Sequence, residues 1–238
     1  MSEWPINFNE EHDMSIEARS VARRAFRLFK LILPFLKKDG LISLRIAGSA
    51  MTQDNYGDID LFPSDEFSFK QAFKGIAPEA KTKNATTYKL PDGTLVQLCN
   101  YALPTLDDLI DSFDFAHIQV GAEIIKYMRG DAGVDIDVYW TNAFRQARFV
   151  QDSWYTGSEY PLSSLLRLQK YRARGDIKRG SAIKATIDIL NDILNRGFGS
   201  LDDFKDQMDA IDLGLVGAEL PLGAFESLQS LYEHLLRG

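Results

Sequence analysis

Residues 45–62 read RIAGSAMTQDNYGDIDLF, and this stretch carries the most informative local pattern in the chain. The short apolar run at 43–47 predicts a buried strand, which Gly48-Ser49 ends. After a Gly-containing turn, the alternation of acidic and apolar residues over 58–61 predicts a second strand. We therefore expect a strand–turn–strand unit in this part of the chain.

The two acidic residues of the second strand have a chemical meaning. One residue, Ile59, separates Asp58 from Asp60, so in a strand the two acidic side chains face the same side, about 6.6 Å apart. Carboxylates this close repel each other unless they are exposed or a cation such as Mg²⁺ compensates them. Upstream, Gly48 allows close approach of a ligand, and Ser49 offers a hydroxyl and an amide to a phosphate. The pattern predicts a site for a metal-bound polyphosphate; the alternative is a surface turn.

This layout resembles the signature of the DNA polymerase beta-like nucleotidyltransferase superfamily, in which a Gly-Ser or Gly-Gly turn and a short spacer precede Asp-hydrophobic-Asp-hydrophobic. Gly48-Ser49 and residues 58–61 match it in order and spacing, and the match covers residues 41–62 well. Beyond them, the chain resembles compact prokaryotic and phage nucleotidyltransferase-like proteins through less specific segments, at 96–98, 113–115 and 166–171. The resemblance implies a palm-like sheet, an NTP or dNTP as donor, and two Mg²⁺ ions, replaceable by Mn²⁺, on Asp58, Asp60 and a third carboxylate.

The third carboxylate departs from the family pattern. Gln97 stands in the strand where that residue is expected, and its neutral amide cannot balance a metal's charge. Asp114 is the leading substitute, with an N-cap or turn residue as its alternative role. A second alternating pair, Asp135 and Asp137, lacks an upstream Gly-Ser and is expected on a solvated strand face, with Asp137 as the reserve candidate.

The resemblance implies transfer of a nucleoside monophosphate from the donor to an acceptor hydroxyl, with release of pyrophosphate. One cation would lower the pKa of the attacking hydroxyl, and the other would stabilise the leaving group. Some members of the superfamily make nucleotide signals in antiphage defence, so an oligonucleotide or such a signal is a possible product. The alternatives are a catalytically inactive nucleotide- or oligonucleotide-binding module that acts through a protein partner, and a structural or toxin–antitoxin type interaction protein.

The order of predicted elements indicates an α+β fold in two domains. Residues 1–150 are expected to form the nucleotidyltransferase palm, with a mixed sheet and a basic N-terminal helix, and residues 151–238 a helical domain. The first predicted helix lies in the segment 15–38 and stops near Pro34, and the others lie at 67–73, 106–112, 162–174, 181–195, 201–213 and 222–236. The other predicted strands lie at 86–90, 94–99, 115–125 and 135–140.

Composition places the chain among globular proteins. It has 238 residues, 45% of them hydrophobic, and a formal charge of −7. The single cysteine, Cys99, excludes an internal disulfide and fits a reducing compartment, and the three His residues show no zinc-ligand spacing. The N-terminus lacks a basic signal-peptide region, and no apolar run approaches about 18 residues. We therefore expect a cytoplasmic protein without membrane insertion.

The charge is unevenly distributed along the chain. Residues 15–38 carry seven basic residues against one acid, and residues 199–238 carry eight acids against two basic residues. Arg167, Lys170 and Arg174 follow one helical stripe and are the predicted triphosphate contacts. We expect the two basic helices to flank the nucleotide cleft and to favour an oligonucleotide or a nucleic-acid end as acceptor. The acidic C-terminal helices are the predicted surface for a protein partner.

Overall fold

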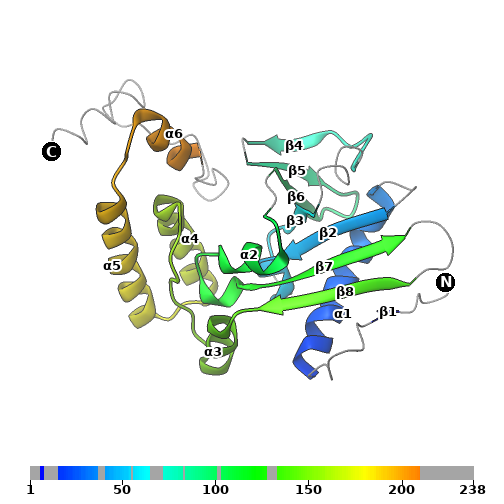
Figure 1. Ribbon diagram of the computed structural model, residues 1–238, viewed down its shortest axis with the longest axis horizontal. Coiled ribbons are helices and arrows are strands. Elements are labelled where there is room, and N and C mark those ends of the chain that lie inside the picture. Colours follow the sequence, from blue (N-terminus) through cyan, green and yellow to red (C-terminus); the bar gives the residue numbers. More distant parts are fainter. Residues whose placement is uncertain are drawn as a thin grey trace. The chain divides into compact units, whose positions relative to one another are not determined.

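The computed structural model describes residues 6–7, 16–36, 41–54, 56–64, 72–82, 84–100, 103–127 and 133–209. The chain forms two compact units, Met1–Phe149 and Val150–Gly238. The first unit contains a mixed sheet with helices, and the described part of the second is helical (Figure 1). The α+β class is confirmed, while the assignment of the units as palm and helical domain stays a prediction.

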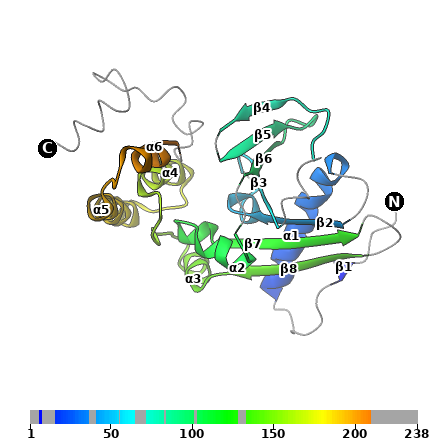
Figure 2. The same ribbon diagram turned by 45° about the horizontal axis from the view of Figure 1, so that its top comes forward.

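A mixed sheet forms the centre of the first unit. Its strands are β1 (Ile6–Asn7), β2 (Leu41–Ala47), β3 (Ile59–Pro63), β4 (Pro78–Lys81), β5 (Ala85–Lys89), β6 (Leu95–Cys99), β7 (Val120–Tyr127) and β8 (Val134–Trp140). They lie in the order β1-β8-β7-β2-β3-β6-β5-β4 (Figure 2). Strand β3 is antiparallel to β2 and parallel to β6, and β1 is parallel to β8, whereas the other neighbours are antiparallel. The sequence motif therefore lies on two central strands.

The described helices keep the predicted order and include one, over 142–150, that was not predicted. They are α1 (Ile16–Ile32), α2 (Leu106–Asp111), α3 (Asn142–Val150), α4 (Pro161–Arg174), α5 (Arg179–Arg196) and α6 (Leu201–Asp209). The prediction of helix over 67–73 lies mostly outside the described residues, with 72–75 forming a turn, and the prediction over 222–236 lies wholly outside them. Within the described part of the chain, no helix has both the length and the apolar character that crossing a membrane requires.

The predicted strand over 115–125 is wrong in its first half. A 3₁₀ turn, Ala116–Ile118, occupies that part, and β7 begins only at Val120. The side-chain amide of Gln119 donates to the Phe113 carbonyl at 2.7 Å, and its oxygen accepts from the Thr141 hydroxyl at 2.7 Å. These bonds hold a buried polar side chain beside a compact turn, which the apolar composition of the segment does not indicate.

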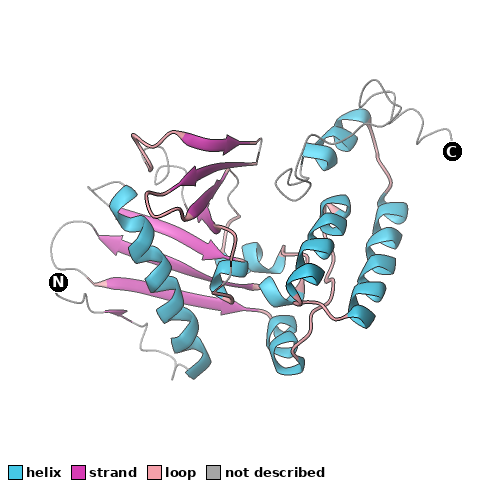
Figure 3. Ribbon diagram, turned by 180° about the vertical axis from the view of Figure 1, so that it is seen from behind, coloured by secondary structure: helices cyan, strands magenta, loops and turns pink. Residues whose placement is uncertain are grey.

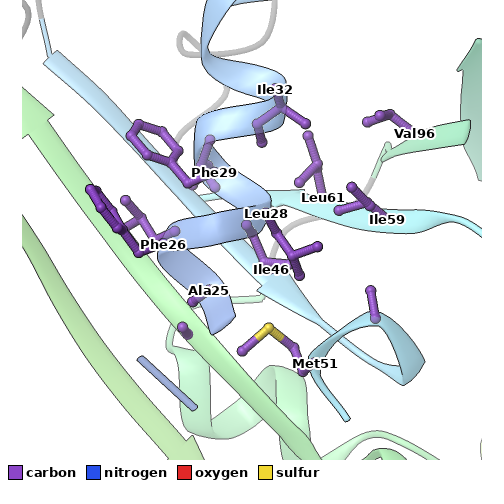
Figure 4. Close-up of a cluster of buried hydrophobic side chains, with 14 of the residues drawn as sticks. Ala25, Phe26, Leu28, Phe29, Ile32, Ile46, Met51, Ile59, Leu61 and Val96 are labelled. Carbon is purple, nitrogen blue, oxygen red and sulfur yellow. The ribbon is translucent and has the colours of Figure 1, made fainter. Parts of the chain in front are cut away.

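One face of the sheet is buried beneath α1. Figure 3 shows α1 crossing this face, and Figure 4 shows the side chains packed between helix and sheet. Ile59 and Leu61 of β3 are fully buried there, because strand alternation turns both toward the helix. From α1 itself the buried residues include Ala22, Ala25, Phe29 and Ile32, at helical spacing. The packing of Ile59 and Leu61 against α1 therefore places the side chain between them, Asp60, on the opposite face of the sheet.

The opposite face is covered in part by α2. Ala47, Phe62 and Cys99 pack there with the apolar side of α2. A Cβ atom on Gly121 would lie 2.6 Å from Ile110 Cδ1 and 3.1 Å from the Ile46 carbonyl oxygen, so glycine allows α2 to lie close to β7.

A buried arginine holds the segment that leads into α2. Arg45 is 3% exposed, and its guanidinium donates to the Leu103 carbonyl at 2.5 Å and to the Pro104 carbonyl at 3.0 Å. It also pairs with Glu123 at 3.5 Å. The Thr105 side chain then caps the helix by accepting from the Asp108 N–H at 3.0 Å. These bonds hold residues 103–105 and the start of α2 in place over the sheet face opposite α1.

In the second unit, a carboxylate joins the start of α5 to the loop between α3 and α4. Asp152 accepts from the Lys178 N–H at 2.8 Å, from the Ser181 hydroxyl at 2.6 Å and from the Ser153 N–H at 2.8 Å. Burial acts to raise the pKa of Asp152, but the three hydrogen bonds and the Lys178 charge outweigh it and bring the pKa below its ordinary value of 3.8.

We expect Asp152→Asn to lower the free energy of unfolding by about 1–2 kcal/mol at neutral pH, because the amide nitrogen cannot accept from Ser181. A lowered native pKa stabilises the protein above the ordinary carboxyl value, and this contribution disappears as pH falls through the native pKa. The difference in unfolding free energy between wild type and Asp152→Asn should therefore disappear below pH 3.8. Urea unfolding at several pH values measures it, with Asp202→Asn, whose side chain is 93% exposed, as control. A gap of constant size across the acid range would contradict the prediction.

Candidate active site

The Gly-Ser turn lies against the carboxylate of the next strand. Gly48 has φ +81°, and its N–H donates to the Val120 carbonyl at 3.3 Å. Ser49 begins a 3₁₀ turn, Ser49–Met51, in which the Met51 N–H donates to the Gly48 carbonyl at 3.0 Å. A Cβ atom on Gly48 would lie 3.1 Å from Asp60 Oδ2. The positive φ favours glycine here, and a Cβ atom would also push the Asp60 carboxylate away by a few tenths of an ångström.

Asp58 and Asp60 lie next to this turn. Asp60 is in β3, in register with Ala47 of β2 on one side and with Gln97 of β6 on the other. Both acidic side chains are half-buried, whereas Ile59 between them is fully buried on the α1 face. The β2–β3 pairing thus brings Asp60 against Gly48, with Ser49 and Asp58 next to them along the chain.

The strand position beside Asp60 is neutral. Gln97 is the register partner of Asp60 on β6, and Thr87 is its partner on β5, so the three side chains form a row across adjacent strands. Two residues along β6, burial raises the pKa of the Cys99 thiol well above its ordinary range, and the negative charges of Asp60 and Asp58 raise it further. Burial and the two nearby negative charges therefore both favour the neutral thiol form of Cys99.

Asp114 lies near the same turn. It is 2% exposed and precedes the 3₁₀ turn Ala116–Ile118, which contacts the turn Ser49–Met51. By contrast, Asp135 and Asp137 are exposed on β8, as expected for a solvated strand face. The role of Asp114 as a metal ligand stays a prediction.

The donor set of the site can be compared with what Mg²⁺ requires. Among the described residues, no three or more His, Cys, Asp or Glu side chains are grouped so as to hold a metal ion. Mg²⁺ keeps several waters and commonly uses one or two protein carboxylates together with substrate phosphates. Asp58 and Asp60 therefore match the number of carboxylates that Mg²⁺ commonly takes from a protein when it binds with a nucleotide, and their role as ligands stays a prediction.

An arginine from α1 fastens the loop between the Gly-Ser turn and Asp58. Arg24 donates through Nε to the Ala50 carbonyl at 2.5 Å, through Nη1 to Asp54 Oδ1 at 2.6 Å, and through Nη2 to the Gln53 carbonyl. Its guanidinium also lies 5.8 Å from the centre of the Tyr56 ring. The hydrogen bond and charge of Arg24 lower the pKa of Asp54 below its ordinary value. Sequence reasoning missed this role because the partners are mostly backbone carbonyls 26–29 residues away.

The other predicted basic residues are placed differently. The basic N-terminal helix, α1, packs on the sheet face opposite Asp60 and reaches the loop over 50–54 through Arg24. That its exposed cations flank a nucleotide cleft stays a prediction. Arg167, Lys170 and Arg174 lie half-buried on α4, in the second unit. Their predicted contact with a triphosphate stays a prediction.

The comparisons with known proteins are limited in reach. No protein-family model matches the sequence, and no curated protein matches it. A solved structure of the Thermotoga maritima CCA-adding enzyme complexed with tRNA_CCA is similar, with a TM-score of 0.45 and 11% sequence identity. The similarity covers 80% of this chain and 50% of that one, so this chain spans about half the length of that enzyme. At this identity, no residue role passes from that enzyme to this chain.

We expect Arg24→Ala to loosen the loop over residues 50–54, because two backbone carbonyls lose their charged donor. The loss should be about 1–3 kcal/mol of unfolding free energy, with faster amide hydrogen exchange at Gln53 and Asp54. Arg23→Ala, at the neighbouring exposed position, should change stability by less than about 0.5 kcal/mol. Equal effects of the two substitutions would show that Arg24 does not fasten this loop.

Proposed function

We propose that this chain is a metal-dependent nucleotidyltransferase that transfers a nucleoside monophosphate from an NTP or dNTP to an acceptor hydroxyl and releases pyrophosphate. The observation that carries the proposal is the approach of Gly48 to the Asp60 carboxylate, with Asp58 and Ser49 beside it. A turn whose backbone lies against a carboxylate pair brings phosphate-binding groups and metal ligands to one point.

Each residue of the site has a proposed part in the reaction. Asp58 and Asp60 hold the Mg²⁺ ions, or Mn²⁺ in their place, through oxygens that face away from the core. The Ser49 hydroxyl and N–H bind a phosphate oxygen of the donor, and Gly48 leaves room for it. When bound, the metal supplies charge stabilisation of the phosphoryl group and a lower pKa for the acceptor hydroxyl. Asp114 is the proposed third carboxylate, because Gln97 is neutral.

The donor's triphosphate needs positive charge beyond the metal. We assign this role to Arg167, Lys170 and Arg174, which share one stripe of α4. The proposals of an oligonucleotide or nucleotide-signal product in antiphage defence, and of a protein partner for the acidic C-terminal helices, rest on the sequence. The single cysteine suits a reducing compartment, so we place the activity in the cytoplasm.

A second candidate function is a catalytically inactive nucleotide- or oligonucleotide-binding module. The observation that favours it is Gln97, which occupies the register position beside Asp60 with a neutral amide. A site with two carboxylates can bind a Mg²⁺–nucleotide without completing the ligand set for transfer. The two candidates differ in turnover and share nucleotide binding.

The test is turnover of labelled nucleotides. The protein is incubated with Mg²⁺ or Mn²⁺ and each labelled NTP and dNTP, with and without RNA or DNA, and pyrophosphate and products are measured. Asp58→Asn and Asp60→Asn should each lower turnover about 100-fold or more, since even outer partners of metal ligands cost about 10–100-fold. Asp135→Asn, on the exposed face of β8, is the control. Separate Asp114→Asn, Asp137→Asn and Gln97→Ala variants identify the third ligand.

The outcomes of this experiment separate the candidates. Nucleotide binding that requires Asp58 and Asp60 but gives no product would support the binding module. The central claim fails if no nucleotide is bound or turned over under any of these conditions.

A second prediction concerns the glycine of the turn. Gly48→Ala should lower turnover several-fold, up to about 10-fold, because the new Cβ shifts the Asp60 carboxylate by a few tenths of an ångström, and a misplacement of about 1 Å costs about 100-fold. Gly93→Ala is the matched control, since Gly93 also has positive φ, +89°, but nothing lies within 4 Å of its Cβ position. Both variants share the backbone strain, so turnover of the folded proteins isolates the contact with Asp60. Equal turnover would remove the proposed role of the turn.

A further inference from the structure

The solvent-facing side of α1 carries a row of cations. Arg19, Arg23, Arg27 and Lys30 are all exposed, at spacings of four, four and three residues. At about 100° and about 1.5 Å per residue, they lie within an arc of about 80° and span about 16 Å along the helix. We name these four residues the α1 stripe.

The α1 stripe is distinct from the basic residue that α1 uses internally. Arg24 is half-buried and fastens the loop at Ala50 and Gln53. The one acid of the helix, Glu17, pairs with Arg148 at 3.2 Å. Within the described residues, no ion pair involves Arg19 or Arg23, and Lys30 Nζ lies 4.8 Å from the centre of the Phe26 ring. The charge of Arg27 acts on Asp54 and helps to lower the pKa of that carboxyl. The fold therefore leaves the charges of Arg19, Arg23 and Lys30, and the exposed guanidinium of Arg27, for an external anion.

We propose that the α1 stripe binds the phosphate backbone of a nucleic acid. Three of the four cations are arginines, whose planar guanidinium forms paired hydrogen bonds with phosphate oxygens. Both phenylalanines of α1, Phe26 and Phe29, are buried beneath the helix, so it offers no aromatic surface on which bases could stack. The interaction is therefore with phosphates and independent of sequence.

Other anionic partners fit the α1 stripe less well. An amphipathic helix binds a membrane by inserting its apolar face, but that face of α1 is already packed against the sheet, with Ala22, Ala25 and Phe29 fully buried. Protein interfaces centre on apolar or aromatic residues with charges at the rim. Here the exposed apolar side chains, Ile16 and Leu31, stand at the two ends, and the charges lie between them.

The stripe lies on the other side of the sheet from Asp60. Strand alternation turns Ile59 and Leu61 toward α1 and Asp60 away from it. A nucleic acid held by the stripe is therefore anchored separately from the Asp58–Asp60 site. The inference goes beyond the proposed enzyme activity and can hold or fail without it.

The test measures binding of fluorescent 20-nucleotide RNA and DNA, single-stranded and duplex, by anisotropy between 50 and 200 mM salt. A variant with Arg19, Arg23, Arg27 and Lys30 replaced by Gln should bind about 10-fold or more weakly. The slope of log affinity against log salt should fall by about 3, at about 0.7–0.9 per phosphate contact. A matched control replaces four exposed cations elsewhere, Lys74, Lys81, Lys89 and Arg145, by Gln and should keep the slope.

Further arms address folding and the location of the site. Replacing the three arginines of the stripe by Lys keeps the charge and should keep most of the salt slope, and circular dichroism checks that every variant is folded. The Asp60→Asn variant should bind as wild type does, because Asp60 lies on the other face.

Four results would overturn the inference. They are no binding by the wild type at 50 mM salt, equal losses in both Gln variants, equal or tighter binding of polyglutamate or of anionic vesicles, and binding that depends on Asp60 but not on the stripe. The last result would place nucleic acid at the proposed active site, so it distinguishes failure of this inference from failure of the proposed function.

Discussion

Burial of Ile59 and Leu61 beneath α1 is the constraint on which the site depends. Both side chains are fully buried, and each contributes about 1.5–3 kcal/mol when removed from water. Because the side-chain period of a strand is two, a shift of one residue in the β2–β3 register would turn Asp60 into the core and these residues out of it. Burial of these two apolar side chains therefore selects the β2–β3 register, and that register sets the direction in which Asp60 points.

The cost of the arrangement is electrostatic. Asp58 and Asp60 are both half-buried and only two positions apart along the chain, so their mutual repulsion is stronger than between carboxylates in water. The pKa of Cys99, on the neighbouring strand β6, is raised mainly by burial and further by the charges of Asp60 and Asp58. A neutral Gln97 beside Asp60 avoids a third charge in the row. Because Gln97 is neutral, a third carboxylate ligand cannot come from this position of β6. Asp114, near the Gly-Ser turn, is therefore the candidate.

The parts of the fold that depend on local periodicity were predictable from the sequence. The Gly48–Asp60 unit follows from strand alternation and one turn, and the β5–β6 hairpin from its Pro-Asp-Gly turn. The role of Arg24 was not predictable, because it is one of several arginines in α1 and its acceptors on the loop are distant in sequence. Likewise, nothing local indicates that Gln119 interrupts the predicted strand, since its partners Phe113 and Thr141 flank it from either side.

The position of α1 also decides what can neutralise the acidic pair. The stripe cations face solvent on the outer side of a helix about 10 Å thick, and the sheet lies between them and Asp60. Solvent ions screen most of the attraction between exposed charges beyond the Debye length of about 8–10 Å at physiological salt. Arg24 is nearer, but its donors are used by Ala50, Gln53 and Asp54. If the pair is neutralised when a nucleotide binds, the charge has to arrive with the ligand, as it does in a Mg²⁺–nucleotide complex.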